Sequence, residues 1–441
     1  MICIIGGGIS GLTTAFYLQK AGLEYCVLEA GSRPGGYITT YKDKDYILEE
    51  GPNSLLMDEA TFEFIKEIGL ESEIEFAKPV NKKRYIFKNG YYQALPSNPI
   101  SLVGSNFFSW TTKFKIFRDL FGSSKATKSE STNKALTLHD FFLEKFGEEV
   151  VEYALQPFIA GIYSGDPKKI LTHLTFPSLL EYENKYGSLI RGLVKNAGAR
   201  KRSITFKNGM QSLPEAIAQG LNIKYRTCVE DISHEDGRYL ISTNQGSVIA
   251  DRLVIATTAH TASNYLKNLL PEISTLLSSI HYPPMLVVHS IYKTTQVTKK
   301  LEGFGGLNPA KENLFTAGSI FSSTIFNDRC PNDEVLFTTF IGGSLFEEAV
   351  LLKDTAVLTS VHKELSQNFV IEGSPLLQKI FRWDKAIPQY DVNLDKLTTA
   401  IEKQESKNLY VCANWYKGVS LGDCIKKGRA TAENIYVHSP K

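Results

Sequence analysis

The sequence predicts an α/β fold, α+β overall, with a Rossmann-like dinucleotide-binding domain, a second domain built on an antiparallel sheet, and a helical insertion. Three observations lead to this prediction. The N-terminus carries a glycine-rich strand–helix–strand unit, residues from about 266 to 374 contain alternating apolar strands, and residues from about 90 to 200 are rich in aromatic and basic side chains. The chain has 441 residues and a formal net charge of +2, which gives no global reason to expect nucleic-acid binding.

The N-terminal unit contains a short apolar strand, a glycine turn, a helix and a second strand, residues 25–28. The turn has the spacing Gly6-x-Gly8-x-x-Gly11. The first glycine makes the tight turn, the second lets the backbone approach a pyrophosphate, and the third allows close packing of helix and strand. Glu29 ends the second strand, where a carboxylate can accept hydrogen bonds from ribose hydroxyls. We therefore expect a dinucleotide site that includes Gly6, Gly8, Ile9, Ser10, Gly11 and Glu29.

The loop after Glu29 distinguishes between two dinucleotides. It begins at Ala30 and contains Arg33 and Gly36, so it is basic and rich in glycine. Such a loop can wrap a second stretch of pyrophosphate and ribose, which suits a cofactor that is buried along its whole length. A nicotinamide that leaves in each turnover needs no such wrapping. The loop therefore favours tightly bound FAD.

Later elements complete the expected order. Residues 286–292 and 335–341 alternate as antiparallel strands. Ser212 to Glu215 has the pattern of a helical capping box. The segment 418–421 precedes a helical run over 423–434, and the N-terminus of that helix could stabilise a reduced flavin through its dipole.

Residues 101–135 interleave aromatic side chains with six basic residues against two acidic ones. This composition suits the boundary between lipid headgroups and acyl chains. The alternative is that the aromatic residues fill a helical core and the lysines form a solvated face. A second basic run starts at Arg191, and residues 123–133 have the composition of a flexible loop.

With these features in place, the chain resembles the protoporphyrinogen oxidase family, within the monoamine-oxidase and phytoene-desaturase superfamily of flavoproteins. The resemblance rests on the glycine loop and on five stretches in the expected order, residues 49–54, 157–167, 176–188, 383–390 and 418–424. It implies further FAD contacts beside the flavin and, at Val229, beside the adenine. These residues are Tyr37, Gly51, Pro52, Asn53, Ser54, Val229, Trp383, Val419, Ser420 and Leu421.

The resemblance implies FAD-dependent oxidation of protoporphyrinogen IX to protoporphyrin IX by successive hydride transfers to flavin N5, with dioxygen as acceptor, in haem biosynthesis. No catalytic side chain is assigned. Gly161 would lie against the macrocycle, and Leu307 and Phe337 or Phe340 would contact its faces. The residue that binds the propionates stays open, although Lys82, Lys83 and Arg84 lie close in sequence to where it could sit.

Three alternatives remain. The nearest is a coproporphyrinogen III oxidase of the same fold. The second is a flavin amine oxidase or a carotenoid desaturase, and the third is a non-catalytic FAD-binding protein. Many amine oxidases attach FAD covalently, but the sequence around Cys412 and Cys424 does not match that pattern, so we expect non-covalent FAD.

The resemblance also divides the chain and suggests its partners. FAD-binding segments are expected at 1–78, 205–265 and 375–441, substrate-domain segments at 79–90 and 266–374, and the helical membrane-associating insertion at 91–204. The expected partners are a porphyrinogen, dioxygen and a membrane surface, with no nucleic acid and no metal. A homodimer and a hand-off of product to a ferrochelatase stay open. The expected location is the cytoplasm, with peripheral association to the cytoplasmic face of the inner membrane.

Overall fold

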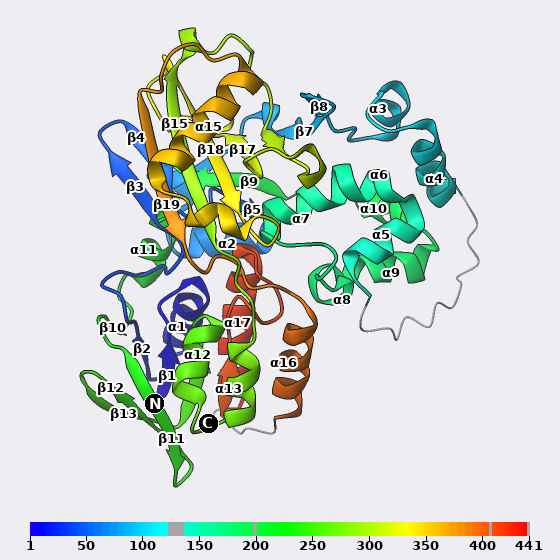
Figure 1. The fold of residues 1–441 in the computed structure, drawn as a ribbon. Coiled ribbons are helices and arrows are strands. Elements are labelled where there is room, and N and C mark those ends of the chain that lie inside the picture. The colour runs from blue at the N-terminus through cyan, green and yellow to red at the C-terminus, as the bar shows by residue number, and fades with distance from the viewer. Residues whose placement is uncertain (122–135, 197–200, 405–407, 439–441) are drawn as a thin grey trace.

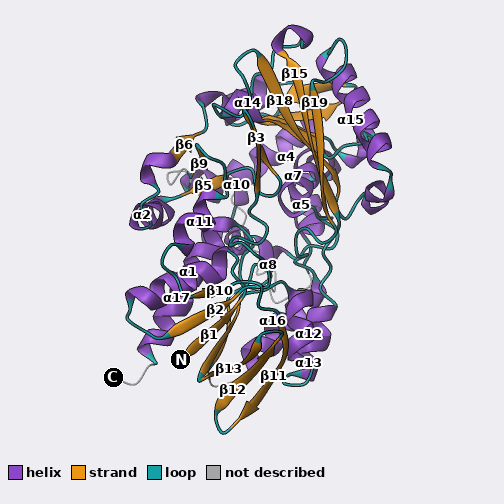
Figure 2. Cartoon of the chain, turned by 90° about the vertical axis from the view of Figure 1, so that its left-hand side faces the viewer, coloured by secondary structure: helices purple, strands orange, loops and turns teal. Residues whose placement is uncertain are grey.

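The computed structural model describes residues 1–121, 136–196, 201–404 and 408–438. The described chain has a lower half with a parallel sheet, an upper half with a larger sheet, and helices that project to one side (Figure 1). Figure 2 gives the view at 90°, with β1 and β2 toward one end of the molecule and β15 and β18 toward the other.

The parallel sheet has the strand order β10-β2-β1-β14-β20 and assembles distant parts of the chain. Its strands are β1 (Ile2–Ile5), β2 (Tyr25–Leu28), β10 (Ile223–Lys224), β14 (Arg252–Ile255) and β20 (Leu409–Val411). Ile2 and Ile4 face the helices α1 (Ile9–Lys20) and α17 (Leu421–Val437), whereas Cys3 and Ile5 point to the opposite layer. The predicted N-terminal strand–helix–strand unit is confirmed.

The opposite layer of this half combines a small antiparallel sheet with helices. Tyr239 and Ile241 from the sheet and Ala259 from a helix share a core with Cys3 and Ile5. The elements are β11 (Val229–Glu235), β12 (Arg238–Thr243), β13 (Gly246–Ala250), α12 (Ala259–Leu266), α13 (Pro271–Ser278) and α16 (Val392–Lys403).

Short elements connect the two halves. They are β3 (Thr40–Asp43), β4 (Tyr46–Glu49), β5 (Leu55–Met57), α2 (Glu59–Glu67), η1 (Glu71–Glu73), β6 (Ile74–Phe76), η2 (Pro79–Lys82), β9 (Arg202–Phe206) and α11 (Ser212–Ala218). The capping box expected at Ser212 is wrong, because α11 starts at Ser212 itself and Gln211 precedes it without a side-chain cap. Gln211 Nε2 instead donates to Glu215 Oε1 at 2.9 Å.

The larger sheet has the order β19-β15-β18-β17-β16-β7-β8. Its strands are β7 (Tyr85–Lys88), β8 (Tyr91–Ala94), β15 (Met285–Lys293), β16 (Gly305–Leu307), β17 (Gly318–Phe321), β18 (Glu334–Gly342) and β19 (Leu377–Trp383). β16 and β7 run parallel, and the other neighbours run antiparallel. One face packs beneath α15 (Asp354–Phe369), and the short helical elements η4 (Thr294–Gln296), η5 (Ala310–Glu312), α14 (Ser322–Ile325) and η6 (Glu347–Leu351) lie in its connections.

The outer strands of this sheet extend past the segment boundaries that we expected. β8 falls in the segment assigned to the insertion, and β19 falls in the segment 375–441 assigned to FAD binding. The sequence of β19, Leu-Gln-Lys-Ile-Phe-Arg-Trp, does not alternate apolar and polar residues, so it carries no clear strand pattern. The division of the chain into domains otherwise stays a prediction.

The projecting insertion is helical, as expected. Its elements are α3 (Pro99–Gly104), α4 (Trp110–Phe121), α5 (Leu138–Phe146), α6 (Glu148–Val150), the π-helical η3 (Val151–Leu155), α7 (Gln156–Tyr163), α8 (Thr172–Thr175), α9 (Pro177–Tyr186) and α10 (Leu189–Lys195).

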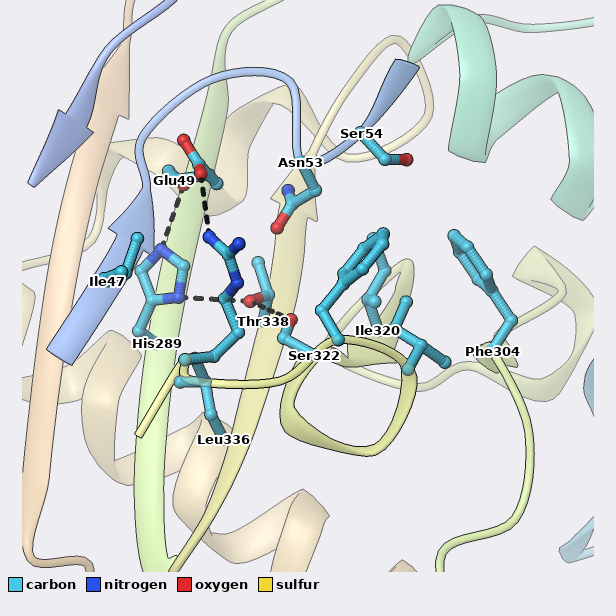
Figure 3. A pocket seen from close by; sticks show the side chains of 13 residues that line it. Ile47, Glu49, Asn53, Ser54, His289, Phe304, Ile320, Ser322, Leu336 and Thr338 are labelled. Atoms are coloured by element: carbon cyan, nitrogen blue, oxygen red, sulfur yellow. Dashed lines mark hydrogen bonds and ion pairs between the residues drawn. The ribbon is translucent and has the colours of Figure 1, made fainter. Parts of the chain in front are cut away.

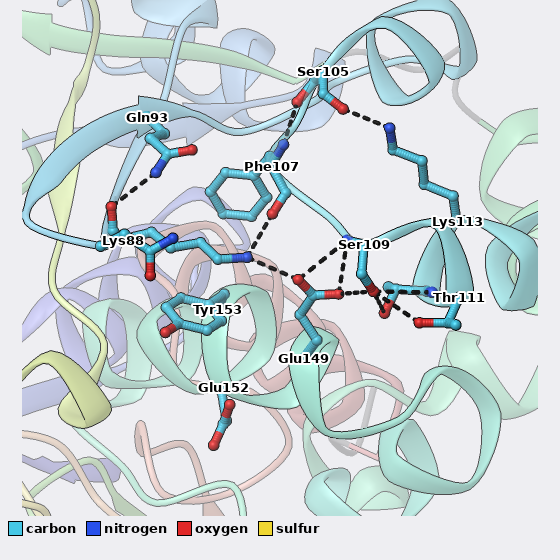
Figure 4. A network of polar contacts seen from close by, with 12 residues as sticks. Lys88, Gln93, Ser105, Phe107, Ser109, Thr111, Lys113, Glu149, Glu152 and Tyr153 are labelled. Carbon is cyan, nitrogen blue, oxygen red and sulfur yellow. Dashed lines mark hydrogen bonds and ion pairs between the residues drawn. The ribbon is translucent and has the colours of Figure 1, made fainter.

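A partly buried ion pair ties the insertion to the larger sheet (Figure 4). The Nζ of Lys88, at the end of β7, donates to Phe107 O at 2.5 Å and to Glu149 Oε1 at 2.8 Å, above the ring of Tyr153. Glu149 also accepts from the backbone N–H and hydroxyl of Ser109. Burial alone would raise the pKa of Glu149, but these hydrogen bonds hold it at about 2. The insertion is thereby anchored by a charged pair whose members are also hydrogen-bonded to Phe107 O and Ser109.

The aromatic and basic stretch divides between core and surface. Phe107 and Phe108 are buried, whereas Trp110, Phe114 and Phe121 are 73%, 67% and 74% exposed. Two bases have structural partners: Lys113 donates to Val103 O and Ser105 O, and Arg191 donates to Leu120 O and Tyr186 O. Within the described ranges, no helix is both long enough and apolar enough to cross a bilayer. The structure does not describe the loop predicted at 123–133, which contains Lys125 and Lys128. Lys134 also lies outside the described residues.

Candidate functional site

The dinucleotide turn joins β1 directly to α1. A Cβ on Gly11 would lie 2.0 Å from Gly6 O, so this close approach of helix and strand requires glycine. In front of Gly8, by contrast, no atom would lie within 4 Å of an added Cβ. The first turn of a helix leaves its N–H groups without intrahelical partners, and no side chain caps α1. Ile9, Ser10 and Gly11 therefore present backbone donors to an open cradle, which fits a pyrophosphate.

Glu29 lies directly beside this turn. Its Oε2 accepts from Gly7 N and its Oε1 from Gly31 N, both at 2.6 Å. Its backbone O accepts from Thr227 N at 2.9 Å, which brings the start of β11, and with it Val229, next to the acid. The predicted adenine-side residues are thus neighbours in space, although nearly two hundred positions separate them in sequence.

The loop after Glu29 folds back onto the glycine turn. Gly35 N donates to Gly7 O at 2.8 Å, and Gly36 adopts the left-handed conformation with φ 55°. The Arg33 guanidinium donates to Ile38 O at 3.1 Å and to Gly36 O at 3.2 Å. It also contacts Pro34 O and the hydroxyl of Thr39. Arg33 therefore holds the shape of its own loop, and Ala30 lies exposed at the beginning of that loop.

The turn over residues 51–54 meets two aromatic side chains from distant segments. Trp383 Nε1 donates to Glu50 O at 2.7 Å, and its ring lies 5.0 Å from that of Tyr37. A Cβ on Gly51 would lie 2.1 Å from Tyr37 O. Burial raises the pKa of Tyr37 to about 12. Tyr37, Gly51 and Trp383, three of the predicted flavin-side residues, are therefore packed together.

Beneath this turn lies a buried polar cluster that sequence reasoning missed (Figure 3). His289 of β15 donates from Nε2 to Glu49 O at 3.0 Å, and its Nδ1 accepts from the Thr338 hydroxyl at 3.1 Å. Burial lowers the pKa of His289 to about 4, so the ring is neutral. Asn53 and Ser54 line the same small pocket.

Glu49 and Arg329 are the acid and the base of this cluster. Arg329 NH1 lies 3.4 Å from Glu49 Oε1, and its NH2 lies 3.0 Å from Glu75 Oε2. Glu49 also accepts from Met210 N and from the hydroxyl of Thr40. Burial raises the pKa of Glu49 to about 7 despite these partners. A histidine within an apolar strand and an acid at a strand end were the available signals, but their pairing depends on contacts 240 positions apart.

The predicted substrate-side residues meet on α7 and the larger sheet. Leu307 Cδ2 would lie 3.1 Å from a Cβ added to Gly161. Leu307 pairs with Gly318, which pairs with Phe340, so Leu307 and Phe340 share one face of the sheet. Phe337 lies three positions from Phe340 along β18 and points to the opposite face, where it is fully buried beneath α15. The prediction that Phe337 contacts a face of the macrocycle is therefore corrected. Of the two phenylalanines, only Phe340 stays a candidate for that contact.

The C-terminal loop begins the last helix. Ser420 caps α17, with Val419 before it and Leu421 as its first residue. α17 packs along α1, so its N-terminal end lies at the same end of the parallel sheet as the glycine turn. Cys412 and Cys424 are both buried.

These features define a dinucleotide-binding fold with a glycine-rich turn after β1 and a second, larger sheet. A family model for flavin-containing amine oxidoreductases matches residues 9–436, and the chain belongs to that family. It is an oxidoreductase and its cofactor is FAD.

Individual relatives extend the similarity over nearly the whole length. The chain is 33% identical to the mitochondrial protoporphyrinogen oxidase of Nicotiana tabacum, over 98% of this chain and 94% of that protein. It is 28% identical to the coproporphyrinogen III oxidase of Bacillus subtilis (strain 168), over 99% and 98%. A crystal structure from Exiguobacterium sp. 255-15 has a TM-score of 0.82 at 23% identity and covers 99% of both chains, which shows the fold.

Proposed function

We propose that this protein oxidises a porphyrinogen to a porphyrin, with protoporphyrinogen IX as the preferred substrate. The observation that carries the proposal is the full-length similarity to oxidases of both protoporphyrinogen and coproporphyrinogen. When bound, FAD accepts two electrons in each oxidation step and is restored by dioxygen. The residues of this chain then have to bind the macrocycle, orient it and exclude water.

The side chains around Gly161 suit an apolar, disc-shaped substrate. Phe158 and Ile162 lie one turn from each other on α7 and are both exposed, and Gly161 neighbours Phe158 at a spacing of three residues. Leu307 and Phe340 supply apolar side chains from the facing sheet. No strong base is needed for hydride loss from a carbon between electron-rich pyrroles, so apolar walls are sufficient for this role.

Arg84 is the proposed partner of the substrate carboxylates. Its guanidinium lies 4.6 Å from the centroid of the Phe304 ring, and Phe304 lines the pocket beside Asn53 and Ser54. Among the described residues, no acid lies within ion-pair distance of Arg84, whereas Lys83 is paired with Glu302 at 3.0 Å. An arginine without an acidic partner can receive a carboxylate in a bidentate manner.

The test is anaerobic mixing of the purified holoenzyme with protoporphyrinogen IX or coproporphyrinogen III, with flavin absorbance as the readout. The proposal expects rapid bleaching with protoporphyrinogen IX and slower bleaching with coproporphyrinogen III, which carries twice as many carboxylates. Faster bleaching with the latter would select the coproporphyrinogen alternative. Bleaching by a primary amine but by neither porphyrinogen would contradict the proposal.

We also propose peripheral binding of the insertion to the cytoplasmic face of the inner membrane. The exposed Trp110 and Phe114 and the neighbouring Lys115 and Arg118 on α4 support this. Sedimentation with anionic phospholipid vesicles tests it. We expect the wild type to pellet at low salt, and the variant with Trp110→Ser and Phe114→Ser to stay in the supernatant. A wild type that stays in the supernatant would contradict membrane binding.

A further inference from the structure

The N-terminus of α17 is capped by its own residues. Ser420 Oγ accepts from Asp423 N at 3.1 Å, and Asp423 Oδ2 accepts from the Ser420 hydroxyl at 2.6 Å and from Ser420 N at 3.3 Å. A carboxylate in this position satisfies free N–H groups and offsets the positive end of the helix dipole. The helix end alone is therefore a weak source of positive potential for a reduced flavin.

Lys427 lies four residues beyond Asp423 on the same helix and reaches back to the loop that precedes it. Its Nζ donates to Ala413 O at 2.6 Å, to Gly418 O at 3.0 Å and to Tyr416 O. An ammonium group has three donors, and all three are used on backbone carbonyls. Among the described residues, no carboxylate lies within ion-pair distance of Lys427, so its charge is not neutralised by a partner.

The loop held in this way has little freedom of its own. Gly418 has φ 110°, and a Cβ there would lie 2.8 Å from Asp423 Cβ. Gly418 leads directly into Val419, Ser420 and Leu421, which we expect beside the flavin. A shift of the loop at Gly418 would therefore move all three residues together.

We propose that Lys427 is a positioning residue for FAD. Its ammonium fixes the loop 413–418 that presents Val419, Ser420 and Leu421 to the flavin, and its unpaired charge supplies the positive potential that Asp423 removes from the helix end. The consequence is that the protein binds reduced flavin more tightly, relative to oxidised flavin, than it would without this lysine. The proposal concerns FAD alone and does not depend on which substrate the protein oxidises.

The matched control is Lys426, the preceding residue on α17. Its Nζ pairs with Asp58, and its side chain is about half exposed. Lys426→Met removes the same formal charge as Lys427→Met and leaves the loop carbonyls untouched. Comparing the two variants separates the effect of the buried ammonium from that of net charge.

The experiment measures the two-electron midpoint potential and the FAD dissociation constant of each holoenzyme. For Lys427→Met we expect FAD to bind about tenfold more weakly, and the ratio of reduced to oxidised affinity to fall about tenfold, which corresponds to a potential lower by ~30 mV. Lys427→Arg keeps the charge and should preserve the potential, even where loop contacts are altered. Lys426→Met should match the wild type in both measurements.

Two results would overturn the proposal. One is a Lys427→Met enzyme with the potential and FAD affinity of Lys426→Met, and the other is a Lys427→Arg enzyme whose potential falls as far as that of Lys427→Met. If Lys427→Met does not fold, Lys427→Gln, which keeps a hydrogen-bond donor without the charge, replaces it under the same criteria. Flavin bleaching by porphyrinogens is a separate measurement, so failure of the proposed reaction would leave this result interpretable.

Discussion

Gly161 lies where a single added carbon would meet the facing sheet. Its backbone is not in a left-handed conformation, so Gly161→Ala should fold normally, with the new Cβ 3.1 Å from Leu307 Cδ2. The neighbour must then move by a few tenths of an ångström, into the space proposed for the substrate. We expect kcat/KM for the porphyrinogen to fall about tenfold or more, with the flavin spectrum unchanged.

The companion variant for Gly161→Ala is the double variant with Leu307→Ala, which removes the opposing methyl groups. Partial recovery of kcat/KM in the double variant would identify the contact as the cause. If Gly161→Ala turns over porphyrinogen like the wild type, Gly161 does not border the substrate.

Glu49 and His289 are buried neighbours whose titrations act in opposite directions. The pKa of Glu49 rises from 4.5 to about 7 on folding, so between these values only the folded state holds the proton. Its contribution to the free energy of unfolding therefore falls as pH rises, by up to about 3 kcal/mol. The pKa of His289 drops from 6.5 to about 4, so its contribution rises with pH between about 4 and 6.5, by a similar amount.

Single substitutions should reveal these two opposing slopes. Relative to the wild type, Glu49→Gln should gain stability as pH rises from 4.5 to 7. The variant lacks the Glu49 carboxyl, whose contribution to the free energy of unfolding falls over this range. His289→Gln should lose stability relative to the wild type between pH 4 and 6.5. Denaturant titrations of the holoenzymes at several pH values measure both effects. Profiles of both variants that run parallel to that of the wild type would show that neither group titrates as described.

At the scale of elements, local sequence determined much of what could be predicted. The glycine spacing and flanking apolar runs predicted β1, α1 and β2, because turn, helix and strand signals all lie within thirty residues. β18 and α17 lie within a few residues of their predicted ranges, since each has its own apolar periodicity. β19 has no such alternation and becomes a strand only by pairing with β15. The bond from Lys427 to Ala413 depends on the path of a loop, for which no sequence pattern exists.

We expect the position of the helical insertion to depend on Lys88. Lys88→Met should leave the Glu149 carboxylate without its cation in a partly buried site, at a cost of about 2–3 kcal/mol. Hydrogen exchange over residues 136–196 should accelerate as the insertion loosens. Lys311→Met removes a more exposed partner of Glu152 and should cost no more than about 1 kcal/mol. Equal exchange rates in the two variants would mean that the pair of Lys88 and Glu149 does not anchor the insertion.

At the scale of the whole molecule, the proposed cofactor site draws on segments that the sequence keeps apart. The parallel sheet takes its strands from both ends of the chain, and this brings the loop before α17 to the same end of the sheet as the glycine turn. Trp383 reaches the site separately, from the end of β19 in the larger sheet, through its contacts with Glu50 O and the Tyr37 ring. Sequence motifs could identify these segments one at a time. Their convergence depends on non-local strand pairing, such as that of β14 with both β1 and β20, which local patterns do not encode.

This convergence predicts how the molecule responds to loss of FAD. A ligand that binds only the folded state stabilises it by about 2.7 kcal/mol at a hundredfold excess over its dissociation constant, so the stripped protein should melt at a lower temperature. Because the proposed contacts are shared among distant segments, hydrogen exchange should rise together at residues 6–12, 33–39 and 413–421. One face of β15 and β18 packs against α15, so these two strands should keep their protection. Faster exchange in the larger sheet but not in these three segments would place the cofactor elsewhere.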